Sequence, residues 1–206
     1  MLAYVFWHRP LDGVDTEAYE RAEVGFHESL RRVPPAGFRG SAVFRVAELP
    51  WLVPTSFTTE AGAGGYEDWY LLEDYTAMGV LNEAAVGSGH RGAHDEAAYR
   101  YGAGAGGLYG LVEGHARQLD LDALAIWVSR PPAGLPGSER RGLAGLLGDG
   151  MSPEHASLWR RQFVFGPAPE YCLLASESPA GVAPTRLPEG WRALTLDRVA
   201  LATESI

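Results

Sequence analysis

Apolar and polar positions in the N-terminal half of the chain predict strands and helices in the order βαββαβ. Ala3 to Pro10 is a short apolar run that ends in Arg-Pro, and a proline there is typical of the end of a strand. Asp15 can cap a helix that runs to about Val33, because apolar residues recur at helical spacing between them. Thr76 is expected to cap a second helix. The remaining strands are expected at Phe38 to Leu49, Tyr66 to Tyr75 and Leu108 to Glu113.

Two long segments interrupt this pattern. Pro50 to Gly65 is rich in Pro, Thr and Gly and is expected to form a loop that is long for a small domain. Gly87 to Gly107 is rich in glycine, with a short helix expected at Asp95 to Tyr101 and a flexible connector at Gly102 to Gly107. Its last part, Gly102 to Gly107, precedes a strand instead of linking a strand to a helix, so it lacks the context of a phosphate-binding loop.

The C-terminal half predicts a second, shorter set of elements. A short helix is expected to begin at Ser138, whereas Pro179 to Pro184 is too rich in proline and glycine to hold a second helix. The predicted strands are Leu124 to Ser129, Ser157 to Phe165, Tyr171 to Ser176 and Trp191 to Ala202.

The two halves match each other in two places. Ala3–Pro10 lies over Leu124–Pro131, and both runs end in Arg-Pro. Asp68–Glu73 lies over Glu170–Ala175 further along the chain. Two matched strands in the same order indicate an internal duplication. We therefore expect two ferredoxin-like units, residues 1–118 and a reduced unit at 119–206, packed as one globular body.

The strands are apolar on both alternations, which indicates that both sheet faces are buried. In the first strand Tyr4, Phe6 and His8 share one side, and Val5 and Trp7 share the other. We expect an α+β fold in which two antiparallel sheets pack face to face as an α/β barrel. In element order the chain resembles the dimeric α/β-barrel superfamily, which includes antibiotic-biosynthesis-type monooxygenases and the chlorite-dismutase and Dyp-type haem proteins. The resemblance implies a fold and does not fix a function.

Composition narrows the classes of partner. The net charge of −9 and the pI near 5.1 argue against nucleic acid as a binding partner. The longest apolar runs are too short to cross a membrane. The chain has no lysine, which excludes Schiff-base chemistry and a P-loop lysine. The single cysteine, Cys172, excludes an intrachain disulfide and favours a cytoplasmic location.

One group of residues suggests a ligand pocket in the first unit. Tyr4, Phe6 and His8 share a strand face, and Arg45 and Tyr70 on neighbouring strands could join them on an aromatic wall with a few polar groups. The alternative for His8 is a position at the wet rim of the sheet.

Other histidines raise separate hypotheses. His90 and His94 are four residues apart and could bind a metal if that segment is helical, or else lie in a surface loop beside a helix capped by Asp95. His27 is interpreted as a solvated helix residue. Trp69 is interpreted as core packing.

The resemblance also suggests haem as a cofactor, because the haem proteins of that superfamily hold it in their second unit. His155 is the one histidine of that unit, so we expect no tightly bound cofactor and leave a metal or haem as alternatives. The leading hypothesis is a small-molecule pocket protein with its pocket in the first unit, either a simple binder or an enzyme like a cofactor-independent monooxygenase or isomerase. The alternative is a non-catalytic scaffold or interaction protein that self-associates as a homo-oligomer.

Overall fold

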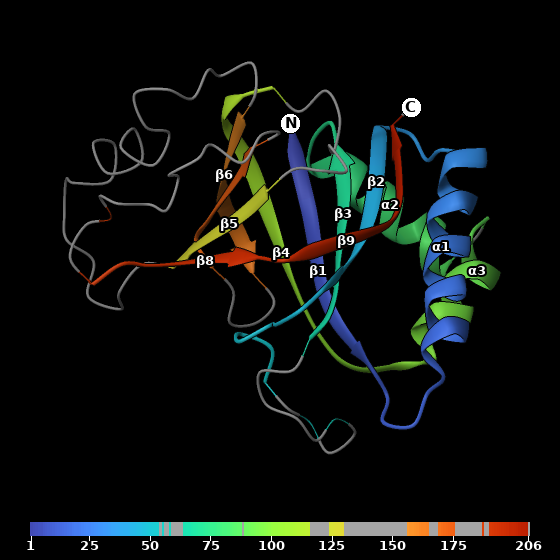
Figure 1. Ribbon diagram of the computed structural model, residues 1–206. Coiled ribbons are helices and arrows are strands. Elements are labelled where there is room, and N and C mark those ends of the chain that lie inside the picture. Colours follow the sequence, from blue (N-terminus) through green and yellow to red (C-terminus); the bar gives the residue numbers. More distant parts are fainter. Residues whose placement is uncertain are drawn as a thin grey trace.

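Three helices and a single nine-stranded sheet make up the described part of the chain (Figure 1). The computed structural model describes residues 1–53, 55, 58, 64–87, 89–115, 124–129, 156–164, 169–175, 187 and 190–205. Its elements are β1 Leu2–Pro10, α1 Thr16–Arg32, β2 Phe38–Val46, β3 Gly65–Leu72, α2 Tyr75–Val86, α3 Arg91–Ala98, β4 Tyr101–Gly114, β5 Leu124–Ser129, β6 Ala156–Val164, β7 Tyr171–Ala175, β8 Arg192–Leu196 and β9 Arg198–Ser205. The helix expected at Ser138, the residue His155 and half of the Pro50–Gly65 segment lie outside the described residues.

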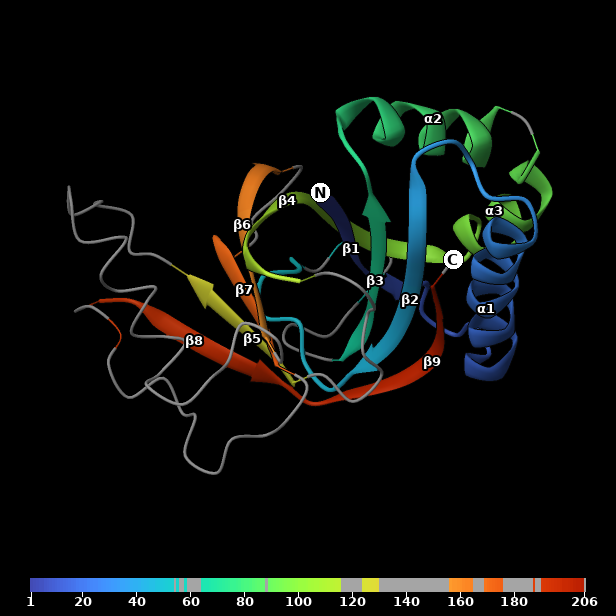
Figure 2. The same cartoon turned by 90° about the horizontal axis from the view of Figure 1, so that it is seen from above.

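The sheet contains the same strand order twice. Its order is β8-β5-β7-β6-β4-β1-β3-β2-β9, and every pairing is antiparallel. Numbered within each half, both sets of four strands read fourth-first-third-second. The halves join edge to edge through β4 and β6, which makes one curled sheet where two stacked sheets were expected (Figure 2). Pairing these two edges satisfies backbone groups that each set alone would leave open.

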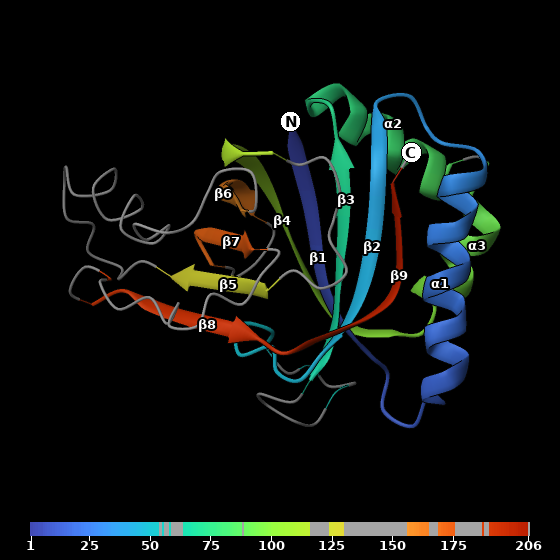
Figure 3. The same ribbon diagram turned by 45° about the horizontal axis from the view of Figure 1, so that its top comes forward.

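The two outermost strands follow each other directly in the chain. Only Asp197 separates β8 from β9, although β8 pairs with β5 at one end of the sheet and β9 with β2 at the other. Figure 3 shows them as one continuous red ribbon that runs between the two ends. The single strand expected from Trp191 to Ala202 is therefore two strands, because the curled sheet brings its ends close enough for the chain to cross between them.

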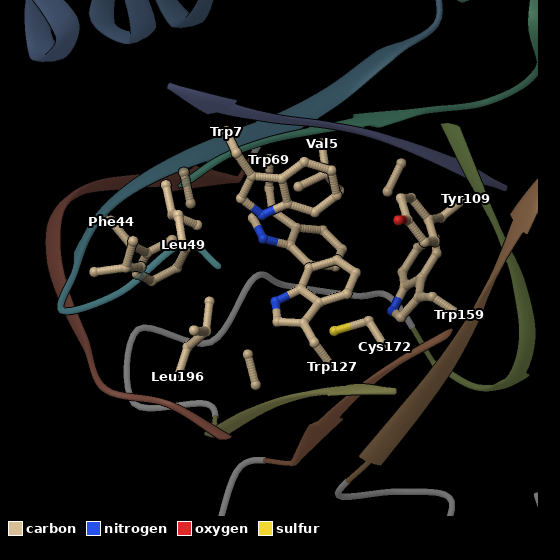
Figure 4. Close-up of a cluster of buried hydrophobic side chains, with 14 of the residues drawn as sticks. Val5, Trp7, Phe44, Leu49, Trp69, Tyr109, Trp127, Trp159, Cys172 and Leu196 are labelled. Atoms are coloured by element: carbon tan, nitrogen blue, oxygen red, sulfur yellow. The ribbon is translucent and has the colours of Figure 1, made fainter. Parts of the chain in front are cut away.

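The concave side of the sheet encloses a core built mainly from tryptophan. Trp7, Trp69, Trp127 and Trp159 are at most 1% exposed and pack together with Tyr109. The indole nitrogens of the first three turn toward one region (Figure 4). Trp69 is thus core packing, as its sequence context predicted.

A carboxylate lies among these indoles. Glu67 is fully buried and accepts hydrogen bonds from Trp69 Nε1 at 2.8 Å, Trp7 Nε1 at 3.0 Å and Trp127 Nε1 at 2.8 Å. Arg198, at the start of β9, donates to it at 3.0 Å. A buried charge needs this degree of pairing to be tolerated, and here the partners come from both halves of the sheet.

The convex side of the first half is covered by the helices. Asp15 caps α1 by accepting from the backbone N–H of Ala18 at 2.7 Å, as predicted. The second helix begins one residue before Thr76 and is capped by Asp74. Together α1, α2 and α3 bury the apolar cluster that includes Phe26, Leu30 and Leu81 against this face of the sheet.

The glycine-rich segment before Leu108 is the first half of β4, so its interpretation as a flexible connector is wrong. Its glycines serve the neighbouring strand β1. A Cβ at Gly104 would lie 2.6 Å from the Phe6 ring, and one at Gly106 would lie 2.7 Å from the Tyr4 hydroxyl. The missing side chains let these two rings lie flat across β4.

Candidate functional site

A cavity of about 370 Å³ lies between the convex face of the sheet and the helices, a volume that suits a small organic ligand. Aromatic and aliphatic side chains form most of its wall. The lining residues are Tyr4, Phe6, Phe26, Tyr70, Met78, Leu81, Asn82, Ala85, Val86, His94, Ala98 and Tyr101.

Stacked rings form the sheet side of the cavity. Tyr4 stacks on Phe6 with ring centroids 6.4 Å apart and on Tyr70 at 5.9 Å. Phe6 contacts Tyr101 at 5.4 Å. The strand register explains this wall, because Tyr4 of β1 pairs with Tyr70 of β3 in the sheet. The ring faces suit a flat, unsaturated ligand.

One histidine contributes a polar group from the helix side. His94, on α3, is partly exposed and its Nδ1 lies 3.2 Å from Asp95 Oδ1. The hydrogen bond from His94, together with Arg91, holds the pKa of the Asp95 carboxyl below its usual value. A carboxylate at one ring nitrogen of a histidine fixes the ring and leaves the other nitrogen available for proton transfer.

A cluster of buried ionisable groups lies directly behind the aromatic wall. His8, Glu23 and Asp68 are fully buried, and one ligand-type atom of each lies within 4.8 Å of the others. His8 Nε2 and Asp68 Oδ1 are 3.2 Å apart. They come from β1, α1 and β3, so the cluster lies in the layer between α1 and the sheet.

Tyrosines connect this cluster to the cavity. Tyr70 donates to Asp68 Oδ2 at 3.0 Å, and Tyr101 donates to Glu23 Oε2 at 3.4 Å. Burial, and then the neighbouring carboxylates, raise the pKa of both phenols well above the ordinary value. Both hydroxyls therefore remain protonated at neutral pH, and they can act only as neutral hydrogen-bonding groups toward a ligand.

The buried groups shift one another's pKa. Burial raises the pKa of Glu23 to about 7, against a smaller lowering by His8. Burial would also raise the pKa of Asp68, but His8 and His27 outweigh it and hold that pKa well below the ordinary value. Burial lowers the pKa of His8, but Asp68 and Glu23 outweigh it and raise it overall.

The predicted ligand residues separate into three groups. Tyr4, Phe6 and Tyr70 line the cavity. His8 lies behind Phe6, with ring centroids 5.1 Å apart, and is fully buried instead of lying at a wet rim. Arg45 is half-exposed, pairs with Glu20 at 3.4 Å and does not line the cavity.

The predicted metal pair is not brought together around one point. His90 Nδ1 lies 3.0 Å from Ser29 Oγ, and its Nε2 lies 2.9 Å from the carbonyl oxygen of Val33. Both of its ring nitrogens therefore have partners that tie α1 to the start of α3. His94 faces the cavity instead.

The interpretation of His27 as a solvated residue is wrong. It is fully buried, its Nδ1 lies 2.7 Å from Ser41 Oγ, and its Nε2 lies 3.8 Å from Asp68 Oδ2. Sequence reasoning also missed Glu23 and Asp68 as members of a site. A signal was present, because Glu67 and Asp68 interrupt an otherwise apolar strand, and a buried strand places adjacent residues on opposite buried faces.

The described lining of the cavity offers a haem one histidine, His94, and no arginine that could pair with its two propionates. In the second unit, His155 lies outside the described residues.

Comparison with solved structures finds proteins of similar architecture. A candidate monooxygenase from Lactobacillus acidophilus NCFM superposes with a TM-score of 0.53 at 10% identity, covering 100% of this chain and 99% of that one. An anthrone oxidase-like protein gives 0.51 at 10% identity, covering 99% and 92%. A candidate chlorite dismutase gives 0.52 at 13% identity, covering 97% and 94%.

Comparisons at the level of sequence find no counterpart. No family model matches the chain, and no curated protein matches it. No helix among the described residues is long and apolar enough to span a membrane. The likeness along nearly the whole chain shows that this protein shares the fold of these structures.

Proposed function

We propose that this protein is an enzyme of the monooxygenase or isomerase type that acts on a flat aromatic small molecule in the cavity beneath α2 and α3. The observation that carries the proposal is the cavity's composition: stacked rings on the sheet side and the His94–Asp95 pair on the helix side. Two of the proteins with a similar fold, an anthrone oxidase-like protein and a candidate monooxygenase, support the same kind of substrate and reaction.

His94 is the group best placed to move a proton. With Nδ1 held by Asp95, its Nε2 can accept a proton from a phenol or an activated carbon of the ligand. The anion formed in this way either reacts with dioxygen or takes back a proton at a different carbon, which gives an oxygenase or an isomerase. The hydroxyls of Tyr70 and Tyr101 donate to Asp68 and Glu23, so on the opposite wall their oxygens orient the ligand as hydrogen-bond acceptors.

The same proposal includes the duplication. The repeated strand order of the two halves supports an origin of units 1–118 and 119–206 from one ferredoxin-like ancestor. β1 and β5, and β3 and β7, occupy equivalent positions, and these are the strands whose sequences match. The first unit holds the cavity, and the aromatic cavity supports a small-molecule function over a self-associating scaffold. The single cysteine supports a cytoplasmic location.

Anthrone and related hydroxylated polycyclic compounds test the proposal. We expect calorimetry to detect binding of at least one of them, and an oxygen electrode or absorbance to detect its turnover. Ala85→Phe should fill the cavity and weaken binding. His94→Gln should retain binding and lower the rate about 100-fold or more.

The matched control is His115→Gln, which changes an exposed histidine outside the cavity. It should behave as the unmodified protein in both assays. The proposal fails if no aromatic compound in the panel binds, or if Ala85→Phe and His94→Gln both leave binding and turnover unchanged.

A further inference from the structure

We infer that His8, Glu23 and Asp68 form a binding site for one divalent transition-metal ion in the layer behind the cavity. The site is separate from the His90 and His94 pair and does not depend on the ligand of the cavity. Three observations carry it: the unpartnered atoms, the partners of the remaining atoms, and the charge balance.

Each of the three residues presents one buried polar atom without a hydrogen-bond partner. These atoms are His8 Nε2, Glu23 Oε1 and Asp68 Oδ1. Buried polar atoms are rarely left unsatisfied, and three of them in one cluster need a common explanation. The ligand-type atoms of the cluster lie within 4.8 Å of one another.

The other atom of each residue is held by a tyrosine. His8 Nδ1 contacts the hydroxyl of Tyr19, Asp68 Oδ2 accepts from Tyr70 at 3.0 Å, and Glu23 Oε2 accepts from Tyr101 at 3.4 Å. Metal ligands are typically oriented in this way, by an outer partner on the atom that does not bind the ion. The tyrosines thus turn one free atom of each residue toward the same space.

A proton shared by His8 and Asp68 leaves the third residue of the cluster aside. His8 Nε2 and Asp68 Oδ1 form an ion pair at 3.2 Å, whereas Glu23 Oε1 makes no hydrogen bond. Ligands that share one ion at about 2.1 Å lie roughly 3 Å apart, which matches this separation. Only a small movement of Glu23 is needed to complete the set.

The charges favour a divalent ion. Metal ligands must be deprotonated, and in that state the two carboxylates and the imidazole carry two negative charges. Arg45 on the same sheet face pairs with Glu20 instead of with these groups. One divalent cation would neutralise the cluster. One nitrogen and two carboxylate oxygens suit zinc or manganese better than calcium, which prefers an all-oxygen site with more ligands.

Metal titration of the full chain tests the inference. The protein is unfolded in urea with a chelator, freed of metal and refolded with Mn²⁺ or Zn²⁺, because a buried ion enters most readily during folding. We expect one bound ion per chain, counted by loss of the free Mn²⁺ signal in electron paramagnetic resonance and by native mass spectrometry for Zn²⁺.

Glu23→Gln and Asp68→Asn should each weaken binding at least tenfold. Glu23→Gln removes a buried charge and is expected to fold, which far-UV circular dichroism will check. If Asp68→Asn does not fold, Glu23→Gln alone still tests the inference. The matched control Glu20→Gln, one turn away on α1 and outside the cluster, should bind normally.

Tyr19→Phe should weaken binding about tenfold by releasing His8. The inference is overturned if the refolded protein binds neither ion, or if Glu23→Gln binds as tightly as the unmodified chain. It is also overturned if His94→Ala abolishes binding while Glu23→Gln does not, since the ion would then belong to the cavity histidine His94. No aromatic ligand is present in these measurements, so their outcome is independent of the proposed activity.

Discussion

Replacing Glu67 by glutamine should destabilise the protein by about 3–6 kcal/mol. The carboxylate accepts from three indole N–H groups and from Arg198, and glutamine can keep only one of its two acceptor oxygens. If that oxygen stays with Trp69 and Arg198, the indoles of Trp7 and Trp127 face an N–H₂ group. Each buried donor left unsatisfied costs about 1–3 kcal/mol, and the loss of charge opposite Arg198 adds to this.

Urea denaturation followed by tryptophan fluorescence measures this loss, since the indoles concerned report their own environment. For a chain of this length the same loss lowers Tm by about 6–24 °C. Glu17→Gln is the matched control, because Glu17 is exposed and pairs only with Arg21 at 3.5 Å. It should change stability by less than about 0.5 kcal/mol.

A double-mutant cycle isolates the interaction from the cost of the substitution itself. Trp127→Phe removes one donor, so it should cost less in the Glu67→Gln background than in the unmodified protein, with a coupling energy of about 1 kcal/mol or more. A loss below about 1 kcal/mol for Glu67→Gln, with no coupling to Trp127→Phe, would refute the view that this carboxylate organises the core.

Three other substitutions test separate contacts. Tyr70→Phe removes a hydroxyl from the cavity wall and should weaken binding of a hydroxylated aromatic ligand several-fold by calorimetry, with no change in far-UV circular dichroism; equal affinities would contradict its orienting role. Gly104→Ala should cost about 1–3 kcal/mol in thermal unfolding, because the new Cβ displaces Phe6 from its place over β4; an unchanged Tm would show that the ring has room. Ser29→Ala takes a hydrogen-bond partner from the buried His90 and should cost about 1–3 kcal/mol by urea titration, whereas no loss would mean that the link between α1 and α3 is dispensable.

Most of the element order could be predicted from the sequence. Apolar residues at helical spacing and the capping Asp15 predicted α1 to within a residue, and the apolar alternations of β1 predicted that both faces are buried. The second half of β4 was predicted, but its first half was missed because glycine has a low intrinsic preference for strands. The reason for these glycines is the pair of rings on β1. The break at Asp197 could not be predicted, since it depends on how far the sheet curls.

Of the site, only the aromatic wall formed by the strands was predicted. Tyr4 and Phe6 share an alternation, and Tyr70 lies beside them because the first and third strands of such a unit pair. Glu23 and His27 are placed by the packing of α1 on the sheet, which the helical spacing alone does not specify. Their burial could have been predicted only if the buried face of α1 had been assumed to extend beyond its apolar residues to Glu23 and His27.

The position of β9 has a consequence for the protein while it is being synthesised. The ribosome makes β2 roughly 150 residues before the strand that pairs with its outer edge. At about 5–20 residues per second, that edge waits on the order of ten seconds for its partner. During this time the open edge of β2 can pair with another nascent chain, so slow translation or early termination before Arg198 should favour aggregation of an otherwise well-paired sheet.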